Sequence, residues 1–420
     1  MAGSRRAVFL CCDGLGRDWV RPETTPFLDK LRGESLWCSE HNAVFPSVTR
    51  VSAASIATGC LPARHGLHGN RMGLMEEGRI VVRDVGAPDF RTHMRRATGG
   101  TLLVPSIAER VAKAGGFIAF SNVSPGAAYF LDPEHFGHIH HRSGSFEPGG
   151  KSIGALEVTH DSAGDWAMTQ RFCAEVLCRA KPAVAFLWIC DPDHTLHEVP
   201  LGSPAHTDVL RQADRCVAEV HRTVEQLRAQ GEEILLLVGS DHGHETIGDS
   251  IDIEDWLAAH GLKELLDAGD VAVAGQGTSA LLYATDRGRS RLLGVVDEIR
   301  RAPWAADVLV GADLAARGFA ADGVVAAIDT ARQGEANPYG VPGRRWMVKE
   351  GKPVPIGCGQ HGGLGPDETR PFLMLNDGRS SGTLKQASSL VDISPTVARF
   401  LGLPLAGFDG SPLPLSGHPS

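Results

Sequence analysis

The sequence predicts an α/β fold in which a mostly parallel sheet is flanked by helices, with a smaller α+β lobe inserted into the chain. Three apolar runs, residues 7–12, 183–190 and 233–239, each lead directly into an acidic turn that also holds glycine or histidine. Uninterrupted apolar runs of this length are typical of parallel strands buried on both faces. Helical patterns lie between the runs, so strands and helices alternate as they do in an open α/β sheet.

Two segments have the periodicity of amphipathic helices. The first begins at Ser203 and Pro204 and carries apolar residues on one face as far as Leu227. Proline at the first helical position is a common start of a helix. The second runs from about residue 164 to residue 180. We expect both helices to pack against the sheet through their apolar faces.

A later part of the chain has a different pattern. It holds a short strand candidate at 278–284, a helix candidate at 289–301 and turns rich in alanine and glycine. The core pattern then resumes with a strand at 371–375 and a helix that begins near Asp392.

The chain has 420 residues, which is near the size at which single cores begin to split. We therefore expect residues 1–260 and 355–420 to form one α/β core, which carries the site described below. Residues 261–354 are expected to form the inserted cap lobe.

Composition excludes several classes of protein. With 42% hydrophobic residues, 22% charged residues and a net charge of −9, the chain does not resemble a disordered protein or one that binds a nucleic acid polymer. No stretch approaches the ~20 apolar residues of a membrane span, and the first apolar run is too short for a signal peptide. The nine cysteines show no C-x-x-C pairing, which predicts reduced thiols in the cytoplasm rather than metal ligands. The oligomeric state stays open, with a homodimer as one alternative.

Acidic residues and histidines recur where the predicted strands end. Ligands of open α/β sheets bind beyond the carboxyl ends of the strands, where these side chains would meet. Taken singly, an aspartate there commonly caps a helix, so the evidence is the set as a whole. The set comprises Asp13, Asp193, His197, Asp241, His242 and His361.

Carboxylate and imidazole donors without thiolates suit zinc, manganese or iron at an open catalytic site. The three aspartates and three histidines are enough for two ions. Two ions about 4 Å apart clamp the attacking and leaving oxygens of an in-line displacement at phosphorus.

A displacement of this kind also needs a nucleophile, and the segment 45–59 supplies hydroxyl groups at the start of a small-residue helix. Thr49 is expected to cap this helix. A hydroxyl there is commonly only a cap, but the same position offers backbone N–H donors and the positive helix end to a phosphoryl group.

With these residues the chain resembles the alkaline phosphatase superfamily, in particular its nucleotide pyrophosphatase/phosphodiesterase branch, and it is similar to phosphonoacetate hydrolase. The resemblance rests on Phe45-Pro-Ser-Val-Thr49, Thr58-Gly59, Leu61-Pro62, His65-Gly66, Asn70 and the tail motif that begins at Asp392. It implies an alkaline phosphatase-like core and two Zn²⁺ ions per chain, with Mn²⁺ or iron as substitutes.

The resemblance also implies a role for each site residue. One ion would be held by Asp13, Thr49, Asp241 and His242, and the other by Asp193, His197 and His361. Thr49 would form a covalent phospho-threonine, and Asn70 would bind a phosphoryl oxygen. The segment Asp-Pro-Asp-His-Thr-Leu-His leaves a competing register open, with Asp191 and His194 in place of Asp193 and His197.

Departures from the family bear on the substrate, which we expect to be a small phosphorus-containing molecule. Arg50 follows Thr49 where nucleotide pyrophosphatases have an aromatic residue, and it is a candidate contact for a substrate anion. Phosphonoacetate hydrolase has lysines after the strand that here ends near Phe120, and this chain has no lysine in that segment. No clear ligands for a third, magnesium-type ion are present. The absence of a third site favours phosphodiester or pyrophosphate bonds over monoesters, whereas Arg50 argues against nucleotide specificity and the missing lysines argue against C–P cleavage.

A group of four histidines and one single histidine have structural explanations that need no role in the reaction. His135, His138, His140 and His141 could contact substrate or hold an ion, but a solvated loop is the expectation. His244 could orient a ligand from outside the metal site, but we expect it to be a bystander.

Three other functions stay open. Cleavage of a C–P bond, as in phosphonoacetate hydrolase, is the main alternative. A phosphomutase or transferase could use the same ligands, although mutases of the superfamily use serine as the nucleophile. A non-catalytic metal-binding protein would not need a hydroxyl among its ligands.

Overall fold

The computed structural model describes residues 5–415, apart from residues 322 and 352. A ten-stranded sheet forms its centre. Strand β1 (Arg6–Cys12) lies between β10 (Val184–Ile189) and β11 (Ile234–Gly239), and both neighbours are parallel to it. Strand β6 (Phe117–Ser121) continues the parallel arrangement, whereas β20 (Leu373–Asn376) pairs with β11 in the antiparallel direction. The prediction of a mostly parallel sheet with three buried apolar strands is confirmed.

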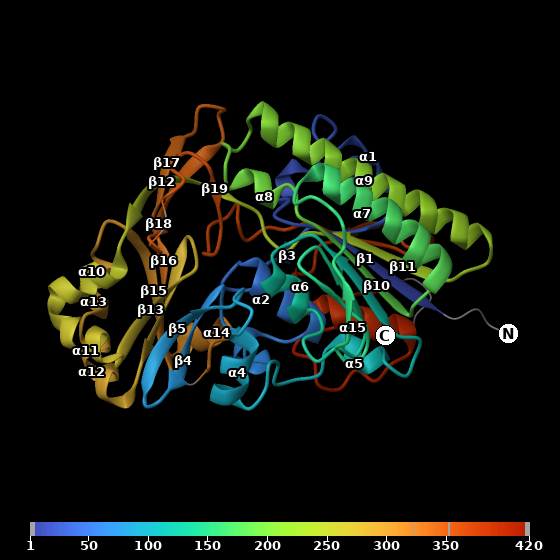
Figure 1. Cartoon of the computed structure of the whole chain (residues 1–420). Helices are drawn as coiled ribbons and strands as arrows, with labels where there is room; N and C mark the ends of the chain where they lie inside the picture. The colour runs from blue at the N-terminus through green and yellow to red at the C-terminus, as the bar shows by residue number, and fades with distance from the viewer. Residues whose placement is uncertain (1–4, 322, 352, 416–420) are drawn as a thin grey trace.

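Both faces of β1 are buried, which explains its uninterrupted apolar sequence. Phe9 and Cys11 contact the cluster under α2 (Thr49–Thr58) and α15 (Ile393–Leu401). The alternate residues Val8 and Leu10 contact the cluster under α7 (Ser162–Arg171) and α9 (Pro204–Ala229). Figure 1 shows these two layers of helices on opposite sides of the sheet. Burying a side chain the size of valine, leucine or phenylalanine contributes about 1.5–3 kcal/mol. The helices on both faces therefore stabilise the strand whose carboxyl end carries the site.

The predicted helix that starts after Ser203 is confirmed as α9, and the Ser203 hydroxyl accepts a hydrogen bond from the His206 amide at 3.2 Å. The second predicted helix is α7 continued by a π-helical segment, η2 (Phe172–Ala180).

The prediction of one helix over 289–301 is wrong. The structure has α12 (Asp286–Gly294) and α13 (Val296–Arg300), separated at Val295, whose ψ angle is 0°. Glycine and two successive valines are poor helix formers, which accounts for the break.

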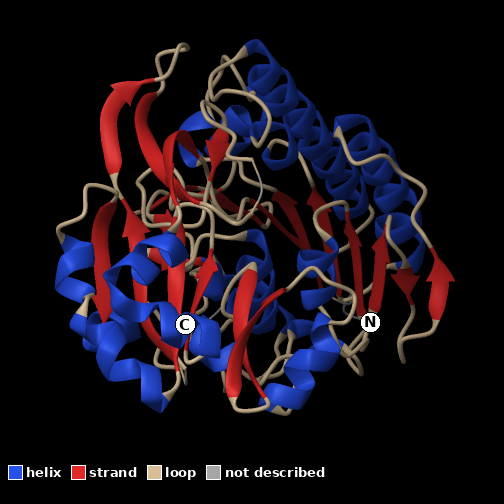
Figure 2. Cartoon of the chain, turned by 60° about the vertical axis from the view of Figure 1, so that its left-hand side comes forward, coloured by secondary structure: helices blue, strands red, loops and turns tan. Residues whose placement is uncertain are grey.

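A second, antiparallel sheet consists of β13 (Val271–Gly275), β14 (Ser279–Ala284), β16 (Val324–Thr330) and β15 (Ala305–Val310). Figure 2 shows it beside the central sheet, with helices packed against it. Its hydrophobic cluster also includes Ile253 and Leu257, which precede residue 261. The exact bounds of the inserted lobe, 261–354, stay a prediction.

The hairpin of β4 (Arg71–Glu76) and β5 (Arg79–Asp84) packs against β13. A third sheet contains β12 (Glu245–Ile251), which follows directly from the site, and its parallel neighbour β18 (Pro342–Val348). The remaining elements are η1 (Arg17–Trp19), α1 (Pro26–Gly33), β2 (Leu36–Cys38), β3 (His41–Asn42), α3 (Pro62–His65), α4 (Phe90–Thr98), α5 (Ile107–Val111), α6 (Pro125–Phe130), β7 (His138–His141), β8 (Ser145–Phe146), β9 (Ser152–Gly154), α8 (Asp193–Leu196), α10 (Ile253–Leu257), η3 (Ala258–Leu262), α11 (Lys263–Ala268), α14 (Gly311–Ala316), β17 (Arg332–Ala336), β19 (Gly359–Gln360), β21 (Gly382–Leu384), β22 (Ser388–Ser389) and η4 (Leu390–Asp392).

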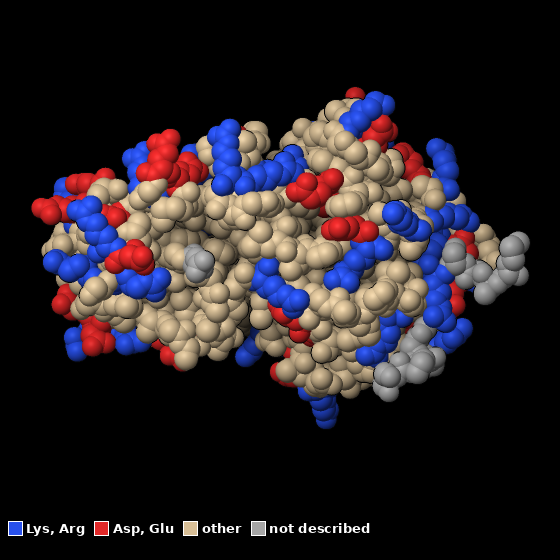
Figure 3. Space-filling view, turned by 90° about the horizontal axis from the view of Figure 1, so that it is seen from below, with Lys and Arg blue, Asp and Glu red and all other residues tan. Residues whose placement is uncertain are grey.

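Charged side chains of both signs are interspersed on the face of the molecule seen from below in Figure 3. Within the described part of the chain, no helix combines the length and the apolar character needed to cross a bilayer.

Candidate metal centre

The carboxyl ends of three neighbouring strands bring the predicted aspartates together. Asp13 follows β1, Asp193 opens α8 after β10, and Asp241 follows β11. The backbone connects them, because the Asp193 amide donates to the Asp13 carbonyl at 3.1 Å. The Gly14 amide donates to Oδ1 of Asp241, also at 3.1 Å. The fold therefore fixes the three carboxylates on one edge of the sheet.

One group of side chains, here called the Asp241 cluster, consists of Asp13, Asp241 and His242. The Nε2 atom of His242 lies 3.2 Å from Oδ2 of Asp241 and 3.5 Å from Oδ1 of Asp13. The Thr49 hydroxyl lies 3.1 Å from the same Nε2 atom. The four predicted residues of this set are thus in contact and buried.

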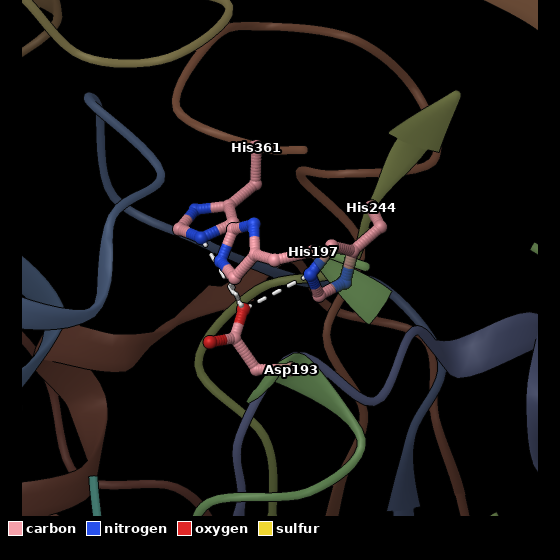
Figure 4. A group of neighbouring side chains, drawn as sticks. All are labelled: Asp193, His197, His244 and His361. Carbon is pink, nitrogen blue, oxygen red and sulfur yellow. Dashed lines mark ion pairs between the residues drawn. The ribbon is translucent and has the colours of Figure 1, made fainter. Parts of the chain in front are cut away.

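A second group, here called the Asp193 cluster, consists of Asp193, His197, His361 and His244. Figure 4 shows the three imidazole rings around the Asp193 carboxylate. The Nε2 atoms of His197 and His361 each lie 3.3 Å from Oδ1 of Asp193, and Nε2 of His244 lies 2.9 Å from it. The expectation that His244 is a bystander is wrong. Its position two residues after His242 was the available signal.

The geometry of both clusters fits metal ions. Two ligand atoms bound tetrahedrally to one zinc ion at 2.0–2.1 Å lie roughly 3.3 Å apart, close to the separations found here. Oδ1 of Asp13, Oδ1 of Asp193 and Oδ2 of Asp241 are buried and have no hydrogen-bond partner among the described residues. Buried carboxylate oxygens are costly unless they are paired or bind a cation.

Backbone carbonyls orient the imidazole rings. Nδ1 of His361 is 2.7 Å from the Ser47 carbonyl, and Nδ1 of His242 is 3.1 Å from the Gly243 carbonyl. An N–H at Nδ1 leaves the lone pair on Nε2, which faces the carboxylates, as in metal-ligating histidines. The rings of His242 and His361 stack with centroids 3.6 Å apart, so the two clusters are adjacent.

Burial shapes the electrostatics of the site. It raises the pKa of Asp13 well above its usual value, and the neighbouring Asp241 carboxylate raises it further. Burial also raises the pKa of Asp241 to about 6. At Asp193 burial alone would raise the pKa, but His197, His244 and His361 hold it well below its usual value. The protein thus assembles carboxylates that repel one another, which a bound cation would stabilise.

Thr49 lies at the buried start of α2, but it is the first helical residue and not the cap. The cap position belongs to Val48, which makes no side-chain capping bond. The prediction of Thr49 as the cap is therefore wrong by one residue. The Thr49 hydroxyl faces His242, and the first amides of a helix have no acceptor within the helix. The helix ends at Gly59, where a Cβ would come within 2.5 Å of Phe408.

Asn70 and Arg50 are connected to each other. Nη1 of Arg50 donates to the Asn70 carbonyl at 2.8 Å, and the guanidinium also pairs with Asp84 on β5. Gln276, which follows β13, accepts from the Asn70 amide at 2.7 Å. Sequence reasoning did not identify Gln276. The Asn70 side-chain oxygen is buried and has no hydrogen-bond partner in the described part of the chain.

The competing register does not assemble. The carboxylate of Asp191 accepts from the hydroxyls of Ser162 at 2.5 Å and Thr195 at 2.8 Å. The His194 ring packs on the His160 ring, tilted by 31°, with centroids 3.9 Å apart. These side chains hold the turn after β10 and do not join the Asp193 cluster.

A third group with donor atoms close together is Asp165, Cys190 and Asp191. Here the Asp165 carboxylate accepts from the Cys190 amide at 3.0 Å, the Asp191 amide at 3.0 Å and Nδ2 of Asn122 at 2.9 Å. Burial and the nearby Asp165 and Asp191 carboxylates raise the pKa of the Cys190 thiol. This group is a hydrogen-bonded turn with a neutral thiol, which is a poor metal ligand.

Three of the four histidines between residues 135 and 141 lie in a strand and not in a solvated loop. His138, His140 and His141 belong to strand β7, which is parallel to β6. His141 is buried, with Nε2 2.8 Å from the Val123 carbonyl, and His140 packs on Phe120 at 4.4 Å between ring centroids. The expectation of a solvated loop is wrong for these three residues.

Comparison with known proteins gives one family and a common fold. The model of the type I phosphodiesterase / nucleotide pyrophosphatase family matches residues 7–305. A search of curated proteins by sequence gives no match. Among solved structures, mouse ectonucleotide pyrophosphatase / phosphodiesterase 5, inactive and in complex with AMP, is 14% identical with a TM-score of 0.69, and the match covers 97% of each chain. Phosphonoacetate hydrolase from Sinorhizobium meliloti 1021, in complex with phosphonoformate, is 17% identical with a TM-score of 0.65, and the match covers 95% of this chain and 96% of that one.

Proposed function

Because the chain belongs to the type I phosphodiesterase / nucleotide pyrophosphatase family, within the alkaline phosphatase superfamily, we propose that it is a two-zinc hydrolase with Thr49 as its nucleophile. Its substrate would be a small phosphorus-containing molecule with a phosphodiester or pyrophosphate bond.

One observation carries the proposal. The Thr49 hydroxyl lies 3.1 Å from Nε2 of His242, which in turn contacts the carboxylates of Asp13 and Asp241. A buried hydroxyl beside two carboxylates and an imidazole, at the start of a helix, is placed for nucleophilic attack if a cation lowers its pKa. A purely structural threonine would not need these partners.

Two Zn²⁺ ions, with Mn²⁺ or iron as substitutes, would supply Lewis-acid stabilisation of charge on the attacking and leaving oxygens. Asp13, Thr49, Asp241 and His242 would hold one ion. Asp193, His197 and His361 would hold the other. The orphaned carboxylate oxygens of both clusters support this assignment.

The residues of the chain would act in sequence. The Thr49 oxygen would attack phosphorus and form a phospho-threonine, while the alcohol or phosphate of the substrate leaves. The Thr49 amide, with the Asn70 side chain, would bind the non-bridging oxygen, whose charge grows in the transition state. Water would then release the product and restore Thr49.

Arg50 would act as a positioning residue for Asn70 in this account. Its guanidinium already binds the Asn70 carbonyl and the Asp84 carboxylate. Direct contact of Arg50 with a substrate anion is the alternative role. We retain cleavage of a C–P bond as the second enzymatic alternative.

Turnover of a panel of substrates by the zinc-loaded protein tests the proposal. The panel contains bis-p-nitrophenyl phosphate, p-nitrophenyl phosphate, a p-nitrophenyl nucleotide ester and phosphonoacetate, because kcat/KM values rank transition-state binding directly. We expect a diester to lead. Turnover of phosphonoacetate alone would favour C–P cleavage, and no turnover with two metals bound would favour a non-catalytic protein.

A further inference from the structure

We propose that Arg345, on β18, is a positioning residue for the proposed metal ligand His361. Its guanidinium pairs with the two carboxylates that hold the loop carrying this histidine, here called the His361 loop (residues 361–365). Strands β14, β16 and β18 would thus be a structural part of the Asp193 cluster and not only a cover beside it. The inference rests on the proposed two-metal function, but its effect on the loop can be measured without metal.

The His361 loop is held by groups outside it. Three of its five residues are glycine, which gives a chain the most backbone freedom, so the loop must be fixed by its surroundings. Glu368 accepts from the amides of Gly363 and Gly365, each at 2.9 Å. Oδ1 of Asp329, on β16, accepts from the Leu364 amide at 2.8 Å. Two carboxylates therefore bind three successive amides of the loop.

Arg345 lies between these two carboxylates. Nη2 of its buried side chain pairs with Oδ1 of Asp329, and Nε lies 3.6 Å from Oε1 of Glu368. Nη2 also donates to the Thr278 carbonyl at 3.3 Å, and the Thr278 hydroxyl donates to Glu368 at 2.5 Å. Burial alone would lower the pKa of Arg345, but Glu368, Asp329 and Glu245 raise it. Buried carboxylates repel one another unless a cation lies between them, and Arg345 is that cation.

The backbone of the loop lies directly on the turn between β13 and β14. The Thr278 amide donates to the His361 carbonyl at 3.3 Å. A Cβ at Gly277 would come within 2.2 Å of that carbonyl oxygen, and a Cβ at Gly362 within 1.5 Å of the Gln276 carbonyl oxygen. Segments packed this closely cannot shift independently. The position of His361 therefore depends on how these strands are held.

A positioning role and a general role in stability predict different metal binding. The residues of the Asp241 cluster lie outside the His361 loop. Loss of Arg345 should therefore weaken only the ion of the Asp193 cluster. A general loss of stability would weaken both ions alike.

Arg345→Met removes the charge and keeps most of the length of the side chain. Chelator competition then measures the affinity of the protein for each of two zinc ions. We expect one affinity to fall by about 10–100-fold, as for other groups that orient a metal ligand, and the other to stay within about twofold of the wild-type value. In a His361→Ala background, the ion that remains should bind equally well with and without Arg345.

Arg6→Met is the matched control. Arg6 and Arg345 are each 2% exposed, and Arg6 pairs with Glu232 at 2.5 Å. Arg6 begins β1, however, whereas the metal centre lies beyond the other end of that strand. This variant should lose stability and keep both zinc affinities.

Hydrogen exchange of the metal-free protein tests the loop itself. We expect the peptide that contains residues 361–365 to exchange at least about tenfold faster in Arg345→Met than in the wild-type protein or in Arg6→Met, because the loop opens locally. Glu368→Gln is the second variant, should Arg345→Met not fold. It keeps the size of the side chain, removes the charge that pairs with Arg345, and should give the same two effects.

Three results in a folded variant would each overturn the inference: both ions weakened alike, both ions bound with wild-type affinity, or unchanged exchange of the loop peptide. Because the exchange is measured without metal, it reports on the loop even if the chain does not use two metals. The stoichiometry and turnover of the wild-type protein decide separately whether the two-metal function stands.

Discussion

Nη1 of Arg50 donates a hydrogen bond to the backbone carbonyl of Asn70 at 2.8 Å, and this bond connects the nucleophile helix to the residue proposed to bind a phosphoryl oxygen. If Arg50 positions Asn70, Arg50→Ala should lower kcat by about 10–100-fold for every substrate, because small displacements of a catalytic group are costly. KM should change little. Steady-state kinetics on several diesters provides the measurement.

Arg83→Ala is the control. Arg83 pairs with Glu76 in the β4–β5 hairpin, which also holds Asp84, but no hydrogen bond joins Arg83 to Asn70 among the described residues. It should retain activity. A rise in KM in Arg50→Ala that is confined to substrates with an additional anionic group would instead identify Arg50 as a substrate contact.

The two aspartates of the Asp-Pro-Asp turn should respond differently to replacement. Asp193→Ala removes the oxygen that three imidazoles approach within 3.3 Å, so we expect the variant to bind one metal per chain. Asp191→Ala removes hydrogen bonds from Ser162 and Thr195, which should lower stability but leave two metals bound. Metal analysis after dialysis tests both. Two metals in Asp193→Ala, or one in Asp191→Ala, would reverse the choice of register.

Gly14 should be irreplaceable for two reasons. Its φ of +67° disfavours a side chain, and a Cβ would come within 2.3 Å of the buried His244 ring. Gly402 is a matched control, with a φ of +73° and no atom within 4 Å of the position that a Cβ would take. We expect Gly402→Ala to cost about 1–2 kcal/mol of unfolding free energy, as for other left-handed positions. Gly14→Ala should cost more and should weaken metal binding, as measured by denaturant unfolding and metal titration. Equal costs with unchanged metal binding would contradict the packing argument.

Metal affinity should depend on pH. Burial raises the pKa of Asp241 to about 6, so the metal-free protein takes up a proton there as the pH falls through about 6. A metal ion must displace that proton, and binding should therefore weaken toward acid by about tenfold per pH unit for each proton displaced. Burial alone would lower the pKa of His361, but Asp193 and the Ser47 carbonyl raise it, which acts in the same direction. Competition with a chelator between about pH 5 and pH 8 gives the affinities, and an affinity that is constant over this range would contradict the prediction.

The sequence predicted the sheet and most of the site because both have local signals. Each apolar strand and the acidic turn that follows it are neighbours in sequence, and parallel strands bring their carboxyl ends together. The strands before Asp13, Asp193 and Asp241 are confirmed on that basis. His244 was undervalued because its partner, Asp193, lies in a different turn of the chain.

The supports of the site could not be predicted, because they connect segments far apart in sequence. Glu368 is buried and accepts from the amides of Gly363 and Gly365, each at 2.9 Å, and from the Thr278 hydroxyl at 2.5 Å. These bonds hold the loop that carries His361. Gln276 holds Asn70 in a similar way from the second sheet. A lone glutamate or glutamine has no sequence signal for such a role.

The covalent state of Thr49 during turnover tests the central claim most directly. The zinc-loaded protein is mixed with a diester, quenched in acid and digested, and the peptide that contains Thr49 is analysed by mass spectrometry. We predict that this peptide carries the phosphoryl group of the substrate. We also predict that Thr49→Ala, with its metals retained, loses turnover by roughly four orders of magnitude or more. Normal turnover in Thr49→Ala, or hydrolysis with the modification on another residue, would contradict the assignment of Thr49 as the nucleophile.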